Sequence, residues 1–235
     1  LMLWLIIATL AYFILAVIYL FDKYLLRGLI PNSKVFAFYV GILGGLSFIL
    51  IPFVEFYVPE IKQVILALLA GSFFIYGLFW FYKGLRLFEA SRIVPVVGGL
   101  SPLFSFGLIY LFSFGKATLS LSESIAFILL VCGSVFITLE KDKSPCRFFL
   151  RSGGGFKLSA LAAFFFSLSF VLTKYVYLVQ SFWNGFIWMR IGGFLTAFVF
   201  FLFSPEIKEE IFKKRISFKK KTAVIFLSSQ IAGAG

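Results

Sequence analysis

The stretch that decides the fold is 63-QVILALLAGSFFIYGLFWFY-82, about 20 residues without one charged side chain. At about 1.5 Å per residue, a helix of this length crosses a hydrocarbon core of about 30 Å. Six further stretches of similar length and composition lie at 2–21, 35–54, 93–113, 120–139, 158–178 and 183–203. The repeated pattern predicts an all-α fold, a polytopic membrane helix bundle.

An eighth apolar stretch begins near Thr222 and reaches Gly235, the last residue of the sequence. A helix that ends inside lipid leaves its last carbonyl groups unpaired. We therefore expect the chain to be truncated in its eighth helix, with about 60 more residues, enough for two further spans.

The composition excludes an ordinary soluble domain, because 61% of the residues are hydrophobic and 14% are charged. The net charge of +12 lies almost entirely between the spans, which favours anionic lipid over nucleic acid as the partner. The basic segment from Lys208 to Lys221 is expected to lie on an anionic leaflet, with apolar neighbours such as Ile207 dipping into it. Tyr57, Tyr82 and Trp183 stand at span ends, as is typical of the aromatic belt.

The basic residues also predict an orientation. All but four of the 22 lie in the loops that follow the first, third, fifth and seventh spans. The exceptions are Lys62, Lys116, Lys174 and Arg190. The positive-inside rule puts those four loops in the cytoplasm and the N-terminus outside.

The chain carries a weak internal repeat. At an offset of 151 residues, Lys23-Tyr24 aligns with Lys174-Tyr175, Gly41 with Gly192 and Phe13 with Phe164. Equivalent loops of the two copies differ strongly in basic charge, which an inverted repeat requires. We therefore predict a first five-helix repeat at 1–140, a linker at 141–157 with glycines at 153–155, and an incomplete second repeat at 158–235.

The fourth span contains Pro95, Ser101 and Pro102 around a glycine pair. Two prolines free backbone carbonyl groups, which lipid does not satisfy. This span is expected to line a substrate path, and a packing kink is the alternative.

The run 82-YKGLRLFEASRIVP-95, the following Ser101-Pro102 and Gly133 resemble the EamA-type repeat of the drug/metabolite transporter superfamily. The start of the second half, 158–175, is similar to the start of that repeat. The resemblance implies ten helices in two inverted five-helix halves with a central substrate path between them. Two features depart from the family: Phe114-Gly115-Lys116 replaces its usual Leu-x-Gly-Glu ending, and family members are drawn with both termini in the cytoplasm.

Arg190 is the first candidate for substrate binding. It lies about 12 Å into its span by helix rise, where a charged side chain costs a few kcal/mol unless it faces a cavity or a partner. Either it binds an anionic or carboxylate part of a substrate, or it caps carbonyl groups of a broken neighbour such as the fourth span.

Two further sets of residues are candidates for the substrate pathway. Ser72, Tyr76 and Trp80 share one face of the third span, and packing is their alternative role. Lys174, with Tyr175 and Gln180, is a candidate outer gate.

Small residues predict close helix packing. Gly41 and Gly45 form one pair, and Gly192 and Gly193 pair with Thr196 and Ala197. The spacing allows backbones to approach closely, and a homodimer remains open as the assembly.

The sequence shows no carboxylate deep in a complete span, since Glu55 and Glu123 stand at span ends. Proton coupling through a buried acid is therefore not predicted. The chain has no histidine, no metal-ligand cluster and no phosphate-binding glycine loop, so we expect no cofactor and no metal.

These features favour a secondary transporter, an exporter of small polar metabolites such as amino acids, in the plasma membrane. It would work by alternating access between the two halves and would not be an enzyme. One rival is a membrane enzyme or assembly subunit that acts on lipids, with Asp22 and Glu89 as its interfacial acids. A non-functional truncated product is the other.

Overall fold

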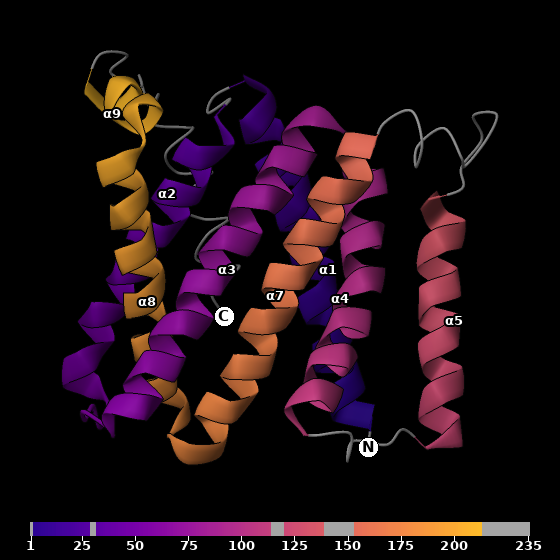
Figure 1. Ribbon diagram of the computed structural model, residues 1–235, viewed down its shortest axis with the longest axis horizontal. Helices are drawn as coiled ribbons and strands as arrows, with labels where there is room; N and C mark the ends of the chain where they lie inside the picture. Colours follow the sequence, from indigo (N-terminus) through magenta and orange to yellow (C-terminus); the bar gives the residue numbers. More distant parts are fainter. Residues whose placement is uncertain (1, 29–31, 114–119, 139–152, 213–235) are drawn as a thin grey trace.

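The computed structural model describes residues 2–28, 32–113, 120–138 and 153–212, and every regular element in them is helical (Figure 1). The elements are α1 (Met2–Gly28), α2 (Ser33–Gly44), the 3-10 helix η1 (Gly45–Phe53), α3 (Ile61–Leu87), α4 (Ala90–Phe112), α5 (Leu121–Thr138), α7 (Gly153–Val179), α8 (Phe182–Phe203) and α9 (Pro205–Phe212). The predicted span near Thr222 lies outside the described residues. So do Phe114-Gly115-Lys116 and most of the predicted linker.

Six helical segments within the described ranges are long and apolar enough to cross a membrane, and α2 with η1 forms one of them. In α5 the apolar stretch is shorter, Leu121–Gly133. The all-α prediction is confirmed, and the chain has the helices of a multi-pass membrane protein. The ten-helix inverted repeat stays a prediction.

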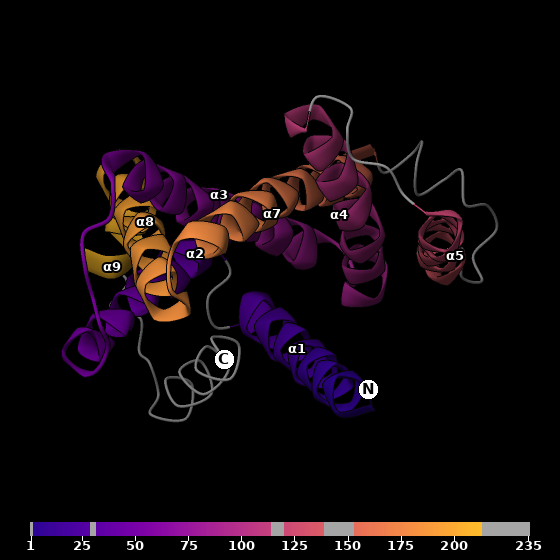
Figure 2. The ribbon, with the colours of Figure 1, turned by 90° about the horizontal axis from the view of Figure 1, so that it is seen from below.

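α3 lies at the centre of the bundle (Figures 1 and 2). It packs against α7 on one side and α8 on the other, while α2 packs on α8 and α4 on α7. α5 packs on α4 at the edge of this row. α1 stands off the row and meets α3 through its second half, where Ile18, Asp22, Leu25 and Leu26 are buried. Its first half is apolar and exposed, as a lipid-facing surface would be.

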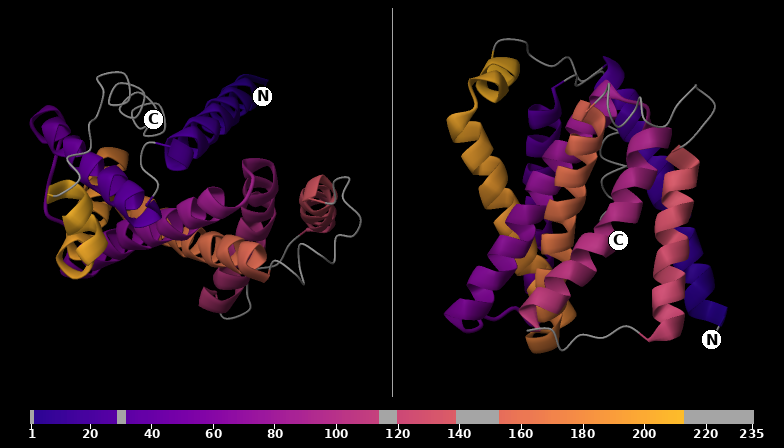
Figure 3. Two further views of the ribbon diagram at one scale, coloured as in Figure 1. Left: turned by 90° about the horizontal axis from the view of Figure 1, so that it is seen from above. Right: turned by 45° about the vertical axis from the view of Figure 1, so that its right-hand side comes forward.

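The ends of the helices follow the distribution of basic residues. The C-terminal ends of α1 and α3, the start of α7 and the whole of α9 lie at one end of the bundle, opposite the N-terminus (Figure 3). These are the ends that carry the basic loops, so the arrangement agrees with the charge pattern. Which side is cytoplasmic stays a prediction.

Glycines set the contact between α8 and its neighbours. A Cβ atom on Gly71 of α3 would clash with the Met189 carbonyl oxygen, and one on Gly192 of α8 would clash with Leu68 backbone atoms. A Cβ on Gly41 of α2 would meet Ala197, while one on Gly45 would meet the Phe194 ring. α8 therefore touches both α2 and α3 at backbone distance, which side chains larger than hydrogen would prevent.

The predicted linker at 141–157 overlaps α7 at its C-terminal end. α7 begins at Gly153, so the glycines at 153–155 form its first turn. The Ser159 hydroxyl donates to the Gly155 carbonyl oxygen at 3.0 Å, within this turn. Glycine lowers helix propensity but does not prevent a helix start, and tertiary packing of the apolar stretch that follows decides the boundary.

α4 is helical throughout, although it contains Pro95 and Pro102. The Ser101 hydroxyl donates to the Val97 carbonyl oxygen at 2.8 Å, and the Ser167 hydroxyl of α7 donates to the Ser101 carbonyl at 2.7 Å. Proline removes the bond to the carbonyl four residues earlier, that of Ser91 for Pro95 and that of Gly98 for Pro102, so these hydroxyl bonds support the helix next to Pro102 without replacing the lost ones. The backbone break falls instead between α2 and η1.

The structure corrects the prediction that Ile207 dips into lipid. Ile207 of α9 is fully buried in the protein core, beside an ion pair of 2.6 Å between Lys34 of α2 and Glu206. The Lys208 ammonium group donates to the Leu202 carbonyl oxygen at the end of α8, at 2.8 Å. The first turn of α9 is thus held by α2 and α8. Residues 213–221 of the predicted lipid-binding segment lie outside the described residues.

We expect Ile207→Ala to loosen α9 from the bundle. Truncating a buried isoleucine costs about 2–5 kcal/mol, because the lost contacts leave a cavity. Amide hydrogen exchange in Pro205–Phe212 should rise strongly. Lys34→Ala is the matched control, since an exposed ion pair contributes only about 0–1 kcal/mol. Equal exchange in the two variants would contradict the assigned role of Ile207.

Candidate functional site

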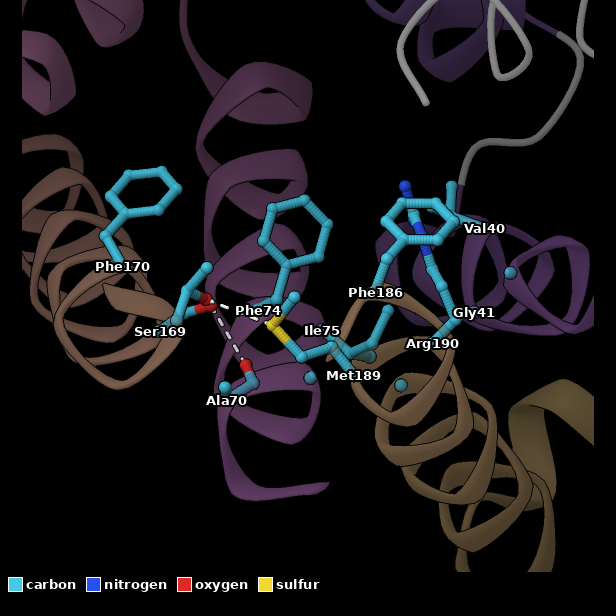
Figure 4. A pocket seen from close by; sticks show the side chains of 14 residues that line it. Val40, Gly41, Ala70, Phe74, Ile75, Ser169, Phe170, Phe186, Met189 and Arg190 are labelled. Atoms are coloured by element: carbon cyan, nitrogen blue, oxygen red, sulfur yellow. Dashed lines mark hydrogen bonds between the residues drawn. The ribbon is translucent and has the colours of Figure 1, made fainter. Parts of the chain in front are cut away.

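A cavity of about 170 Å³ lies between α2, α3, α7 and α8, in the middle of the bundle (Figure 4). It is lined by Val40, Gly41 and Gly44 of α2; Ala70, Gly71, Phe74 and Ile75 of α3; Ser169, Phe170 and Thr173 of α7; and Phe186, Met189, Arg190 and Gly193 of α8. Four of these residues are glycines and one is alanine, so backbone forms part of the walls. The same small residues that let the helices approach also leave this space between them.

Arg190 is the charged residue of the cavity wall. Its guanidinium carbon lies 4.8 Å from the centre of the Phe186 ring, one helical turn earlier on α8 (Figure 4). Among the described residues, no side chain forms an ion pair or hydrogen bond with it. An arginine at the centre of a membrane helix costs about 2.5–3.5 kcal/mol on insertion scales. Stacking on Phe186 offsets only part of that cost, about 0.5–2 kcal/mol.

The backbone break of the second span lies beside this arginine. α2 ends at Gly44 and continues as nine residues of 3-10 helix, Gly45–Phe53. A 3-10 run is seldom longer than three or four residues, and in mid-helix it often marks a hinge. A Cβ on Gly44 would lie 3.6 Å from the Arg190 Cδ atom. Arg190 therefore does lie against a broken neighbour, but that neighbour is the second span and not the fourth.

Two hydroxyl groups complete the polar part of the wall. The Ser169 hydroxyl of α7 donates to the Ala70 carbonyl oxygen at 2.9 Å (Figure 4). The Thr173 hydroxyl, one turn later, donates to the Met189 sulfur at 3.2 Å. Both oxygens keep lone pairs that can accept a hydrogen bond from a solute. The cavity thus combines one cation, two hydroxyls, aromatic rings and backbone.

The predicted pathway face of α3 does not line this cavity. Ser72 donates to the Leu68 carbonyl oxygen at 2.8 Å and to that of Gly192 at 3.4 Å, so it lies in the α3–α8 contact. Tyr76 packs between Phe165 and Phe200, with ring centres 5.8 and 5.2 Å away. The Trp80 ring lies 5.0 Å from the Lys83 ammonium group. α3 is packed between α7 and α8. Ser72, Tyr76 and Trp80 lie on faces of α3 that contact these or other side chains, while the cavity is lined by a different face of α3.

The other predicted pathway residues also lie elsewhere. Pro95, Ser101 and Pro102 belong to α4, which contributes no residue to the cavity wall. Lys174 is exposed on α7, next to the lining residue Thr173. Arg190 is therefore the one predicted pathway residue that lines the cavity.

A buried amide cluster holds the end of the bundle near the start of α8. The Asn184 side-chain NH2 group donates a hydrogen bond to the Gln180 side-chain oxygen at 3.1 Å. The Asn184 side-chain oxygen accepts one from the Tyr57 backbone N–H at 3.2 Å. The Trp188 indole donates to the Tyr57 carbonyl oxygen at 3.2 Å. Gln180, predicted to join Lys174 in a gate, instead ties α7 to the segment before α3 through Asn184.

The sequence reasoning missed a buried acid. α1 runs on to Gly28, so Asp22 lies inside the helix and not after it, and only 1% of its surface is exposed. Its carboxyl group is hydrogen-bonded to Tyr82, which is 3% exposed and not part of an aromatic belt. Hydropathy ends a span at the first charge, but here Ile18, Leu25 and Leu26 continue the buried stripe around Asp22. An interfacial catalytic role for Asp22 does not fit this burial.

Comparisons with known proteins give no match: no family model, no curated protein and no solved structure matches this chain. The resemblance to the EamA-type repeat therefore rests on the quoted residues alone.

Proposed function

We propose that this chain is a secondary transporter of small metabolites that carry a carboxylate, with Arg190 as the group that binds the carboxylate. The observation that carries the proposal is an arginine without an anionic partner among the described residues, facing a cavity inside a membrane helix bundle. Charged residues inside membrane spans typically face a cavity or the bundle interior and mark substrate or ion pathways, and half-buried Arg190 faces such a cavity. A bound carboxylate would supply the missing countercharge.

The size and chemistry of the cavity support a small solute. Its volume of about 170 Å³ is close to that of an engineered cavity of about 150 Å³ that takes up benzene. The Ser169 and Thr173 hydroxyls suit an ammonium or hydroxyl group of the solute, while Phe74, Phe170 and Phe186 suit its apolar part. Amino acids and related metabolites combine these features.

The position of the cavity supports alternating access. α2 and α3 come from the proposed first repeat, and α7 and α8 come from the proposed second, so both halves contribute walls. Transporters built from inverted repeats bind substrate at that interface, next to discontinuous helices. The α2–η1 break beside Arg190 is such a feature. The ten-helix EamA-like architecture, export as the direction and the plasma membrane as the location belong to this proposal.

Matched solutes test the proposal. The thermal unfolding midpoint of the full chain in lipid nanodiscs would be measured with amino acids and with the corresponding amines that lack the carboxylate. We expect saturable stabilisation by some amino acids, about 2.7 kcal/mol at one hundred times the dissociation constant, and none by their amines. Equal stabilisation by each amine and its amino acid would refute carboxylate recognition.

A further inference from the structure

Asp22 is a second ionisable group inside the bundle, separate from the cavity. Only 1% of its surface is exposed, and it lies in the middle of the buried stripe with which α1 meets α3. One carboxyl oxygen shares a hydrogen bond with Tyr82, while Oδ1 has no partner among the described residues. A buried carboxylate with an unpaired oxygen is costly, whereas a protonated carboxyl group needs far less compensation.

The charged and titratable groups around Asp22 do not neutralise it. Lys23, the next residue, directs its ammonium group to the carbonyl oxygens of Leu85 and Phe88 at the end of α3. Glu89 and Arg27 interact electrostatically with Lys23. The Tyr19 ring, one turn before Asp22, meets the Phe81 ring edge-on, and Tyr82 is hydrogen-bonded to the other carboxyl oxygen of Asp22. None of these groups forms an ion pair with Asp22 in the described part of the chain.

We propose that Asp22 is a proton-binding site: its carboxyl group holds a proton while α1 is seated on α3, and gives the proton to water when this contact opens. The proton comes from water at the basic end of the bundle, since Asp22 lies about 9 Å from the end of α1 by helix rise. In the protonated form the carboxyl group joins Tyr82 without an unpaired charge. In the ionised form the same contact buries an uncompensated anion, so α1 and α3 separate more readily.

α3 connects this proton site with the cavity. Tyr82 lies two turns beyond Ile75, a lining residue of the cavity, which is about 10 Å along the same helix. A shift of α3 on loss of the proton would therefore move Tyr82 at the proton site and Ile75 in the cavity wall together. The assignment of the proton site does not depend on the transport proposal, because proton binding is measurable without any solute.

Infrared spectroscopy of the full chain in lipid nanodiscs tests the site directly. At about pH 6, solvent-exposed carboxyl groups are ionised, since their ordinary pKa values are about 4. We expect the carbonyl stretch of one protonated carboxyl group in the wild-type protein and no such band in Asp22→Asn. Glu123→Gln, which removes an exposed acid of α5, is the control and should keep the band. In Tyr82→Phe the band should remain but shift in frequency. A wild-type protein without the band would overturn the proposal.

The pH dependence of stability gives a second readout. The chain has no histidine, the side chain that normally titrates between about pH 5 and 8, so no histidine contributes to the slope in this range. A proton held by the folded chain is released on unfolding, so stability falls as pH rises, by up to tenfold in the folding equilibrium constant per pH unit. Glu123→Gln should keep this slope and Asp22→Asn should lose it. An unchanged slope in Asp22→Asn, or stabilisation by sodium at fixed pH that requires Asp22, would overturn the proton assignment.

Discussion

Replacing Arg190 by alanine is expected to weaken the binding of a carboxylate solute by at least about 30-fold, because removing one partner of a buried charge pair costs about 2–5 kcal/mol. The guanidinium is the charge of the cavity wall, so no neighbouring lining residue can replace it. Binding would be measured by calorimetry on the full chain, with a solute that stabilises the wild-type protein.

Two variants control this experiment. Lys174→Ala removes another cation of the bundle, exposed on α7 beside the lining residue Thr173, and should leave affinity unchanged. Arg190→Lys keeps the charge but loses the planar fork that binds carboxylates through two hydrogen bonds, so we expect an intermediate affinity. Full affinity in Arg190→Ala would show that the carboxylate binds elsewhere.

Gly71→Ala is expected to destabilise the bundle by forcing two helix backbones apart. Its Cβ atom would meet the Met189 carbonyl oxygen, a backbone atom of α8 that cannot turn away as a side chain can. α3 and α8 must move apart, and overpacking of this kind costs about 1–3 kcal/mol or more. Gly192→Ala should behave alike, since its Cβ atom would meet the Leu68 backbone.

Gly98→Ala is the matched control for these two variants. Gly98 lies in α4 with no atom within 4 Å of the added Cβ, so alanine there should gain about 0.5–1 kcal/mol of helix stability. Unfolding midpoints of the purified chain would be compared. If Gly71→Ala were as stable as Gly98→Ala, the close contact of α3 with α8 would be contradicted.

The helices were predictable because membrane spans depend on length and hydropathy, which a single sequence displays. The ends of α1 and α7 were not, because they depend on tertiary packing. Asp22 ended a span by its charge, yet Tyr82 and the apolar stripe around it keep the helix intact to Gly28. The glycines at 153–155 were assigned to the linker, and the structure includes them in the first turn of α7.

The sequence predicted one residue of the candidate site, Arg190. A lone arginine in an apolar span needs a cavity or a partner, and this argument found Arg190 without a structure. The remaining lining residues are small, apolar or aromatic apart from Ser169 and Thr173, and such residues also occur throughout the other spans, so the sequence does not single them out. Which face of α3 borders the cavity depends on how it packs between α7 and α8, and Ser72 and Tyr76 proved to lie in those contacts.

The break in α2 shows the limit of proline as a signal. Pro95 and Pro102 predicted a break in the fourth span, but α4 is one continuous helix from Ala90 to Phe112. In the second span, α2 ends at Gly44 and the 3-10 helix begins at Gly45, with Pro52 near its end. Two adjacent glycines weaken a helix, and the Arg190 side chain lies beside Gly44 while the Phe194 ring lies beside Gly45.

Solute counterflow in proteoliposomes tests the central claim most directly. Vesicles that contain the full chain would be loaded with an unlabelled amino acid, and the uptake of the same labelled amino acid would be followed. We predict transient uptake above protein-free vesicles for the wild-type chain and for Lys174→Ala, and its loss in Arg190→Ala. Uptake that is equal in Arg190→Ala and wild type, or absent for every carboxylate solute that stabilises the protein, would contradict the account.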